Sequence, residues 1–184
     1  MIPNKPTTWS ELSRGQLVVE YATVCFRSQE DCGPFDTDQV QKILDKIDAS
    51  HKVGLRDRAL VGVLAYTFAR IGAVVNLKVE DYFQTGKRSL IRFKEKGGKE
   101  KEIPVHHKLE ELLDEYLKVS ELNKQPAAAL FPIAVGKTHK LGDRPMTRID
   151  AARMLKRRLK EAGLPEAFSA HSFRATTTKG FAVL

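Results

Sequence analysis

The residues of this 184-residue chain that are best suited to chemistry are basic, and the first of them is Arg70. It directly follows an almost continuously apolar run, residues 60–68, which is typical of a helix at the centre of a core. An arginine held at the edge of such a helix can bind a phosphate through two parallel hydrogen bonds. An exposed arginine at a helix end gives the same pattern, so Arg70 alone leaves both interpretations open.

A second candidate is Lys96, which precedes the pair Gly97-Gly98, with Lys99 directly after it. The runs on either side, 89–94 and 99–105, are typical of strands. Two glycines between such runs predict a tight hairpin turn, because both central positions need positive φ. A lysine at this turn could donate a proton to the leaving oxygen of a phosphodiester. A solvated lysine at a hairpin tip would look the same in the sequence.

The third candidate is the pair His171 and Arg174, which are three residues apart. In the helix that we expect to begin near Ser169 or His171, this spacing puts the imidazole and the guanidinium on one face. Such a pair suits an anionic ligand, but it also occurs as an ordinary surface pair.

The periodicity of apolar residues predicts an α+β fold that is mainly helical, with a small three-stranded antiparallel sheet. The strands are expected at 89–94 and 99–105, with a third within 79–83, and Pro104 places the last of them at an edge. Leu130-Phe131 is expected to anchor the long connection 121–146 in the core. The expected helices are one capped by Thr37, one at about 55–69, a short one through Val74, Val75 and Leu77, one at about 107–119, one from Thr147 to Gly163, and the final one.

The first 35 residues have a different character. Thr8 and Glu11 have the spacing of a capping box, which predicts a short helix at 9–26. Cys32-Gly33-Pro34 then breaks the pattern. We therefore expect residues 1–35 to be an N-terminal segment outside the main domain, and 36–184 to be that domain.

The charge of the chain is basic and unevenly distributed. The formal net charge is +8, and residues 137–160 carry most of a basic surplus. In the helix that follows Thr147, Ile149, Ala152, Leu155, Leu159 and Ala162 are expected to form one apolar side. The cations on the rest of the helix favour a polyanionic partner such as nucleic acid. The residues predicted to bind DNA are Lys99, Arg148, Arg153, Lys156 and Arg157.

Several functional classes are disfavoured by what the sequence contains. Its two cysteines, Cys25 and Cys32, form neither a disulfide scaffold nor a set of metal ligands. We find no signal peptide and no apolar run of membrane-spanning length. The expectations are a cytoplasmic protein with no membrane partner and no metal.

Four motifs in order over residues 36–176 resemble the catalytic domain of tyrosine recombinases, the phage integrase type. The resemblance implies that Arg70 and Arg174 clamp the scissile phosphate, that His171 assists proton transfer, and that Lys96 acts as general acid. It also implies double-stranded DNA and further recombinase subunits as partners, with no cofactor. The motifs are Leu55-Arg56-Asp57-Arg58-Ala59-Leu60 with Tyr66 to Arg70, Glu95-Lys96-Gly97-Gly98-Lys99-Glu100, Leu130-Phe131, and Ser169 to Thr176.

Two of the departures from the family pattern concern particular residues. In the family, the nucleophilic tyrosine follows the His-x-x-Arg motif by some tens of residues, but the tyrosines here are Tyr21, Tyr66, Tyr82 and Tyr116, all upstream. Ala73 stands where many relatives carry an acidic residue.

These departures lead us to expect a C-terminally truncated recombinase, a mobile-element remnant that is inactive alone. Three other interpretations remain open at this point. The chain could be a non-catalytic DNA-binding module that interferes with an intact recombinase, or an enzyme completed by one. It could also be a helical interaction protein without a DNA role.

Overall fold

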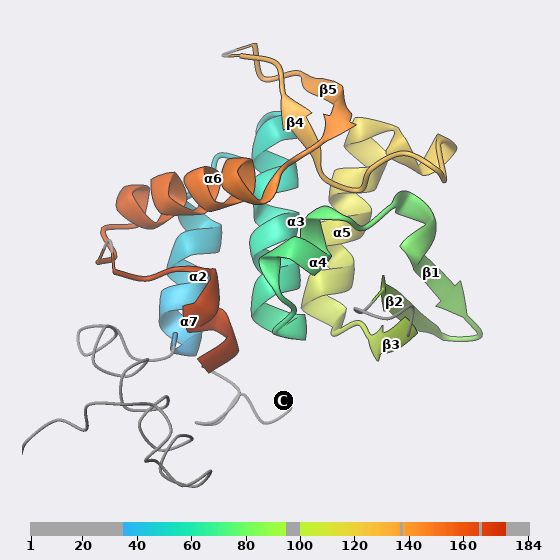
Figure 1. The fold of residues 1–184 in the computed structure, drawn as a ribbon, viewed down its shortest axis with the longest axis horizontal. Coiled ribbons are helices and arrows are strands. Elements are labelled where there is room, and N and C mark those ends of the chain that lie inside the picture. The colour runs from blue at the N-terminus through green and yellow to red at the C-terminus, as the bar shows by residue number, and fades with distance from the viewer. Residues whose placement is uncertain (1–34, 95–99, 137, 166, 176–184) are drawn as a thin grey trace, which may run out of the picture. The chain divides into compact units, whose positions relative to one another are not determined.

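The computed structural model describes residues 35–94, 100–136, 138–165 and 167–175. Helices and a small sheet pack together as an α+β fold, as predicted from the sequence (Figure 1). The expected helix at 9–26 and the turn at Gly97-Gly98 lie outside the described residues. In chain order the main helices are α2 (Thr37–Lys46), α3 (Lys52–Thr67), α4 (Ile71–Val75), α5 (His107–Ser120), α6 (Arg148–Glu161) and α7 (Ala170–Ala175).

Helix α3 lies at the centre of the core, which confirms the interpretation of its apolar sequence. Its side chains are buried on nearly every side, and Leu60, Val63 and Leu64 have no exposed surface. The helix begins three residues earlier than predicted because His51 caps it, with His51 Nδ1 accepting a hydrogen bond from the Gly54 N–H at 2.9 Å. It ends where Phe68 adopts a left-handed conformation, and this leads the chain directly to Arg70.

The N-terminal cap of α2 differs from the prediction. Asp36, not Thr37, precedes the helix, and its carboxylate accepts a hydrogen bond from the Gln39 N–H at 2.7 Å. The Gln39 side chain accepts one from the Asp36 N–H in return, which completes a capping box. The choice between two adjacent capping residues depends on this reciprocal bond.

The three-stranded antiparallel sheet has the order β1 (Tyr82–Thr85), β2 (Arg88–Lys94), β3 (Glu100–Pro104). Lys94 pairs with Glu100 and Leu90 with Pro104, which confirms the predicted hairpin and the edge position of Pro104. The third strand was placed too early. Residues 79–81 form a 3₁₀ turn, η2 (Val79–Asp81), in which the Asp81 carboxylate accepts from the Lys78 N–H.

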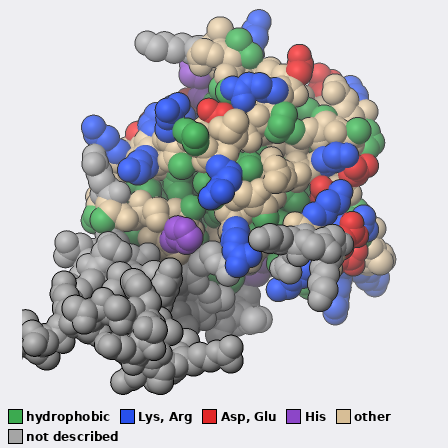
Figure 2. All heavy atoms as spheres, viewed as in Figure 1, with side chains coloured by type: hydrophobic (Ala, Val, Ile, Leu, Met, Phe, Trp, Pro, Cys, Tyr) green, Lys and Arg blue, Asp and Glu red, His purple; other side chains and the backbone are tan. Residues whose placement is uncertain are grey.

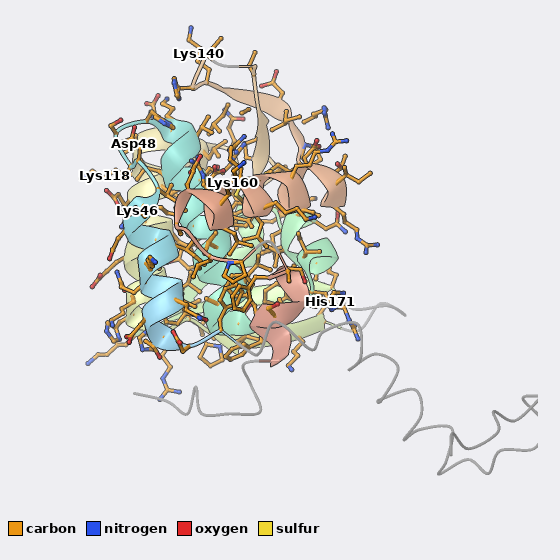
Figure 3. All side chains as sticks on the ribbon, turned by 90° about the vertical axis from the view of Figure 1, so that its left-hand side faces the viewer. Lys46, Asp48, Lys118, Lys140, Lys160 and His171 are labelled. Carbon is orange, nitrogen blue, oxygen red and sulfur yellow. The ribbon has the colours of Figure 1, made fainter. Side chains whose placement is uncertain are left out.

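The connection between α5 and α6 contains structure that the sequence did not reveal. A turn, η3 (Leu122–Lys124), is followed by two short paired strands, β4 (Pro132–Ala134) and β5 (Leu141–Pro145). Leu130 and Phe131 just before them are fully buried, as predicted. In Figure 1 this hairpin lies at the opposite end of the view from α7, and Figure 3 shows Lys140 far from His171.

Helix α6 has the predicted capping box, with Thr147 Oγ1 accepting from the Asp150 N–H at 3.1 Å. Its buried side, however, was assigned partly wrongly. Ala151, Met154, Leu155 and Leu159 face the core, whereas Ile149 and Ala152 are exposed. Because each helical residue advances by about 100°, Ile149 lies on the far side from Ala151. The exposed fraction of Ile149 reaches 62%.

Helix α7 is held by a cluster of three aromatic rings. The ring of Phe35 lies 4.3 Å from that of Phe168 and 4.3 Å from that of Phe173, measured between centroids, and all three are buried. The expected domain boundary assigned Phe35 to the N-terminal segment, but here it packs in the core of the helical domain.

A buried carboxylate joins α3 to α6. Asp57 is fully buried; its Oδ1 accepts from Arg56 Nε at 3.0 Å, and its Oδ2 accepts from Arg158 Nε at 3.0 Å. Arg157 adds a longer ion pair at 3.6 Å. Arg158 is one of the cations that the sequence placed on the rest of α6, away from its apolar side. Asp57 instead holds it largely buried, because a charge in the core must be paired.

The search for membrane spans covered the described ranges, and none of their helices combines the length and apolar character that crossing a bilayer requires.

Candidate functional site

A cleft of about 1090 Å³ lies where five elements meet. Its walls are the end of α3, the helix α4, the β2–β3 hairpin, the beginning of α6 and the beginning of α7. Arg70, the strands on either side of the hairpin motif and His171 are far apart in the sequence, yet all contribute to this hollow. The fold therefore gathers the candidate chemistry into one place.

Arg70 and His171 both line the cleft. Arg70 is exposed rather than half-buried, because the left-handed turn at Phe68 carries it out of the core. Within the described ranges, no carboxylate lies within ion-pair distance of Arg70, so its guanidinium can bind an external anion. His171 is also exposed on α7, as Figure 3 shows.

The hairpin wall of the cleft is basic. Lys94 at the end of β2 and Lys101 on β3 both line it. Lys94 has a distant partner, with its Nζ 3.9 Å from an Asp81 carboxylate oxygen. One acid, Glu102, reaches the cleft as well, but Arg92 binds it at 3.2 Å. The wall therefore presents a positive charge to the cleft.

Three predicted residues remain untested by the geometry. Lys96 and Lys99 lie in the segment 95–99, outside the described residues. Arg174 belongs to α7 by its backbone, one helical turn after His171, but its side chain is not described. Of the four predicted catalytic side chains, two are thus placed in the cleft.

Arg148 extends the cleft toward α6. A methyl group on Gly72 would lie 3.2 Å from Arg148 Cδ, so the glycine leaves room for this side chain to cross α4. Arg148 also borders a second hollow, shared with Ile71, beside the first. The sequence predicted Arg148 only as a DNA-binding residue. In the structure Arg148 lines both the cleft and the second hollow.

The remaining predicted DNA-binding residues on α6 divide into two groups. Arg153 and Lys156 line the second hollow, and neither has an acidic partner among the described residues. Arg157 instead approaches Asp57 and Glu161, which offset its charge. Arg153 and Lys156 therefore remain strong candidates for phosphate contacts, and Arg157 becomes a weaker one.

Figure 2 shows how charge is distributed over one face. Lys and Arg side chains are spread over α6 and toward the hairpin, with hydrophobic atoms exposed between them. Acidic side chains gather mainly on the side where β1–β3 lie. A basic surface of this extent attracts a polyanion.

Sequence reasoning missed Lys94, Lys101 and Asn76, which all line the cleft. The register of the hairpin places Lys101 directly opposite Phe93, and the sequence does not give that register. In the described part of the chain, no three His, Cys, Asp or Glu side chains are grouped as metal ligands would be.

Comparison with known proteins gives a consistent result. The model of the phage integrase family matches residues 34–180. Tyrosine recombinase XerD of Corynebacterium glutamicum is 32% identical over 143 residues, which cover 74% of this chain and 43% of that protein. Tyrosine recombinase XerC of Pelobacter propionicus is 26% identical over 141 residues, covering 77% of this chain and 43% of that protein.

Solved structures agree with these matches. The XerH site-specific recombinase bound to its palindromic difH substrate, in the post-cleavage complex, has a TM-score of 0.59 and 25% identity, covering 79% of this chain and 41% of that one. The catalytic core of lambda integrase shares the fold, with a TM-score of 0.55 and 17% identity, covering 79% of this chain and 80% of the core. This chain thus spans less than half the length of the curated relatives that it matches.

Proposed function

This chain belongs to the phage integrase family of tyrosine recombinases, and from that premise we propose that its basic cleft binds one backbone phosphate of double-stranded DNA during site-specific recombination. The observation that carries the proposal is the meeting of Arg70 and His171 in one cleft with a basic hairpin wall. XerH, which is 25% identical, was solved bound to its palindromic difH substrate.

Each residue has a distinct role in the proposal. The guanidinium groups of Arg70 and Arg174 donate hydrogen bonds to the phosphate oxygens, on which negative charge builds as phosphorus is attacked. His171 holds a phosphate oxygen or the proton of the attacking hydroxyl. Lys96 donates a proton to the 5′ oxygen that leaves. Lys94 and Lys101 add positive charge to the same wall of the cleft.

Among the residues that the structure describes, none of the three tyrosines is suited to act as the nucleophile. Tyr116 donates its hydroxyl hydrogen bond to the buried Leu130 carbonyl at 2.9 Å, and Tyr82 donates to Asp114 at 2.8 Å. Burial raises the pKa of both phenols, which disfavours the reactive phenolate. Tyr66 lines the cleft, but burial raises its pKa too and its ring stacks on His106.

A polypeptide of these 184 residues should therefore bind DNA without forming a phosphotyrosyl link. We expect no adduct resistant to denaturant after incubation with nicked versions of duplexes that the protein selects from a random pool. XerH with difH duplex serves as the positive control for the assay. A covalent band that disappears in Tyr66→Phe would contradict the proposal and identify that tyrosine as the nucleophile.

Phosphate binding in the cleft is tested by Arg70→Ala. Losing a charged hydrogen-bond donor to a phosphate should weaken binding to a mixed-sequence duplex by about tenfold to hundredfold. The slope of log affinity against log salt should become shallower by about one phosphate contact. Fluorescence anisotropy over a salt titration measures both quantities.

Arg88→Ala is the matched control, because Arg88 is an exposed arginine at the start of β2 and does not line the cleft. It should change the affinity by about twofold or less, since an exposed charge outside the contact is screened by salt. Equal losses from both variants would mean that binding depends on net charge and not on the cleft.

A second candidate function is a DNA-binding module that is completed by, or interferes with, an intact recombinase. It is favoured because the cleft and the unpaired cations of α6 depend on no tyrosine nucleophile. Titrating the polypeptide into a cleavage reaction of an intact relative distinguishes the outcomes. Rescue of a relative whose own Arg70 counterpart is replaced indicates completion, and a fall in its cleavage rate indicates interference.

A further inference from the structure

The second hollow, beside the cleft, has an unusual composition for a surface next to a phosphate site. Ile71, Ile149 and Ala152 contribute apolar surface, and Arg148, Arg153 and Lys156 surround them. Ile149 is the most exposed of the three large hydrophobic side chains that stand out from the described surface. An isoleucine this exposed lies outside the core and is available to a partner.

The positions on α6 form a single stripe. Ile149, Ala152, Arg153 and Lys156 follow the spacing i, i+3, i+4, i+7, which places them on one side of the helix. Ala151, Met154 and Leu155 occupy the buried side. The stripe is therefore a complete outward face, apolar at its N-terminal end and basic further along.

The charges around Ile149 indicate what the stripe binds. Arg148, Arg153 and Lys156 have no carboxylate partner among the described residues, so they are available to phosphates. Arg148 and Ile71 also line the cleft, so the second hollow adjoins it and is within reach of a duplex whose phosphate enters the cleft. The width of the DNA major groove admits an α-helix.

Apart from its three cations, which we assign to the phosphate backbone, the hollow has little capacity to read a base by hydrogen bonds. Thr147 lines it, but the Thr147 hydroxyl already donates to Asp150 Oδ2 at 2.8 Å and accepts from the Asp150 N–H at 3.1 Å. The remaining surface of the hollow comes from the aliphatic side chains of Ile71, Ile149 and Ala152. In the major groove the one aliphatic group of the four bases is the thymine methyl.

We propose that Ile149 is a specificity-determining residue that contacts the methyl group of a thymine near the bound phosphate, while Arg148, Arg153 and Lys156 hold the flanking backbone. The proposal rests on the proposed function, because it requires DNA to occupy the cleft. It adds a sequence preference to a surface whose other contacts are with the sequence-independent backbone.

The test begins with a pool of random 24-base-pair duplexes, from which the wild-type protein and Ile149→Ala each select bound molecules. Wild type should enrich thymine at one fixed position, and Ile149→Ala should lose that preference alone. Replacing this thymine with deoxyuridine removes only the methyl group. The change should weaken wild-type binding by about fourfold, the contribution of one buried methyl group, and leave the affinity of Ile149→Ala unchanged.

Val135→Ala is the matched control, because Val135 is another exposed apolar residue, at 49%, and lies outside both hollows. It should discriminate thymine from deoxyuridine as well as wild type does. Circular dichroism should show that Ile149→Ala keeps its fold, as expected for an exposed side chain.

The outcomes separate this inference from the proposed function. Suppose that Arg70→Ala weakens binding but the deoxyuridine duplex binds wild type as tightly as the thymine duplex. The proposed role of Ile149 is then wrong, and the proposal that the cleft binds a DNA phosphate is still supported. Equal sensitivity of wild type and Ile149→Ala to the missing methyl would also overturn the role of Ile149, as would an Ile149→Ala defect seen only in self-association. If the protein binds no duplex, both proposals fail.

Discussion

Replacing Asp57 with alanine is expected to lower the free energy of unfolding by about 3–5 kcal/mol. The substitution removes the carboxylate that pairs with both Arg56 and Arg158. The buried Arg56 guanidinium would be left without an acid, and Arg158 would keep only Glu161, whose carboxylate oxygen lies 2.7 Å from Arg158 Nη1. Arg56 would keep only its hydrogen bond to the Pro132 carbonyl at 2.8 Å. Urea unfolding followed by circular dichroism measures the change.

The control for this substitution is Asp143→Ala, which removes an exposed aspartate. It should change stability by about 0.5 kcal/mol or less. A loss of less than about 1 kcal/mol in Asp57→Ala would mean that water solvates Arg56 and that Glu161 is a sufficient partner for Arg158. The joining of α3 to α6 through this carboxylate would then need another explanation.

Replacing Phe173 with alanine is expected to lower the free energy of unfolding by about 3–5 kcal/mol and to abolish DNA binding in the cleft. The exposed fraction of Phe173 is 1%, and its ring packs against Phe35, which in turn stacks on Phe168. Helix α7 has only six residues, so it depends on this packing and not on its own helical propensity. Because α7 carries His171, its loss should remove one side of the cleft. Thermal unfolding and DNA binding report the two effects.

Phe83→Ala is the comparison for Phe173→Ala. Phe83 is half-buried on β1, with the Arg92 guanidinium 4.7 Å from its ring centre. Phe83→Ala should lower the free energy of unfolding by clearly less than Phe173→Ala does. Its DNA affinity should stay near that of wild type. If Phe173→Ala unfolds at the wild-type temperature, the aromatic cluster does not hold α7 in place.

Much of the fold could be predicted because its signals are local. The apolar run of α3, the capping box at Thr147 and Asp150, and the hairpin around Gly97-Gly98 all depend on residues close in sequence. Errors of a few residues arose where a neighbouring residue competed for the same role, as Asp36 does with Thr37. Local chemistry gives the elements and leaves their ends uncertain.

The sequence could not provide the contacts between residues that lie far apart in the chain. Arg158 looked like part of a solvated basic face, but its partner Asp57 lies 101 residues earlier in the chain. Ile149 looked like a core residue until α6 was oriented by Ala151 and Met154. The exposure of Arg70 depends on the left-handed conformation of Phe68, a residue type with no preference for it.

These long-range features also determine the character of the site. The pairing of Arg158 and Arg157 with Asp57 directs two of the cations of α6 toward α3, and it leaves Arg148, Arg153 and Lys156 for an external anion. Some cations of α6 thus stabilise the fold, and others are available to bind a ligand. The net charge of +8 alone does not show this division.

The central claim is that the cleft lined by Arg70 and His171 is a phosphate site. A crystal of the protein soaked with tungstate, a tetrahedral oxyanion that scatters X-rays anomalously, tests this without knowledge of the DNA target. The account predicts an anomalous peak in the cleft with an oxygen about 3 Å from the Arg70 guanidinium, on the side that faces His171. A cleft without a peak, in a crystal where tungstate occupies only the outer surface of α6, would contradict it.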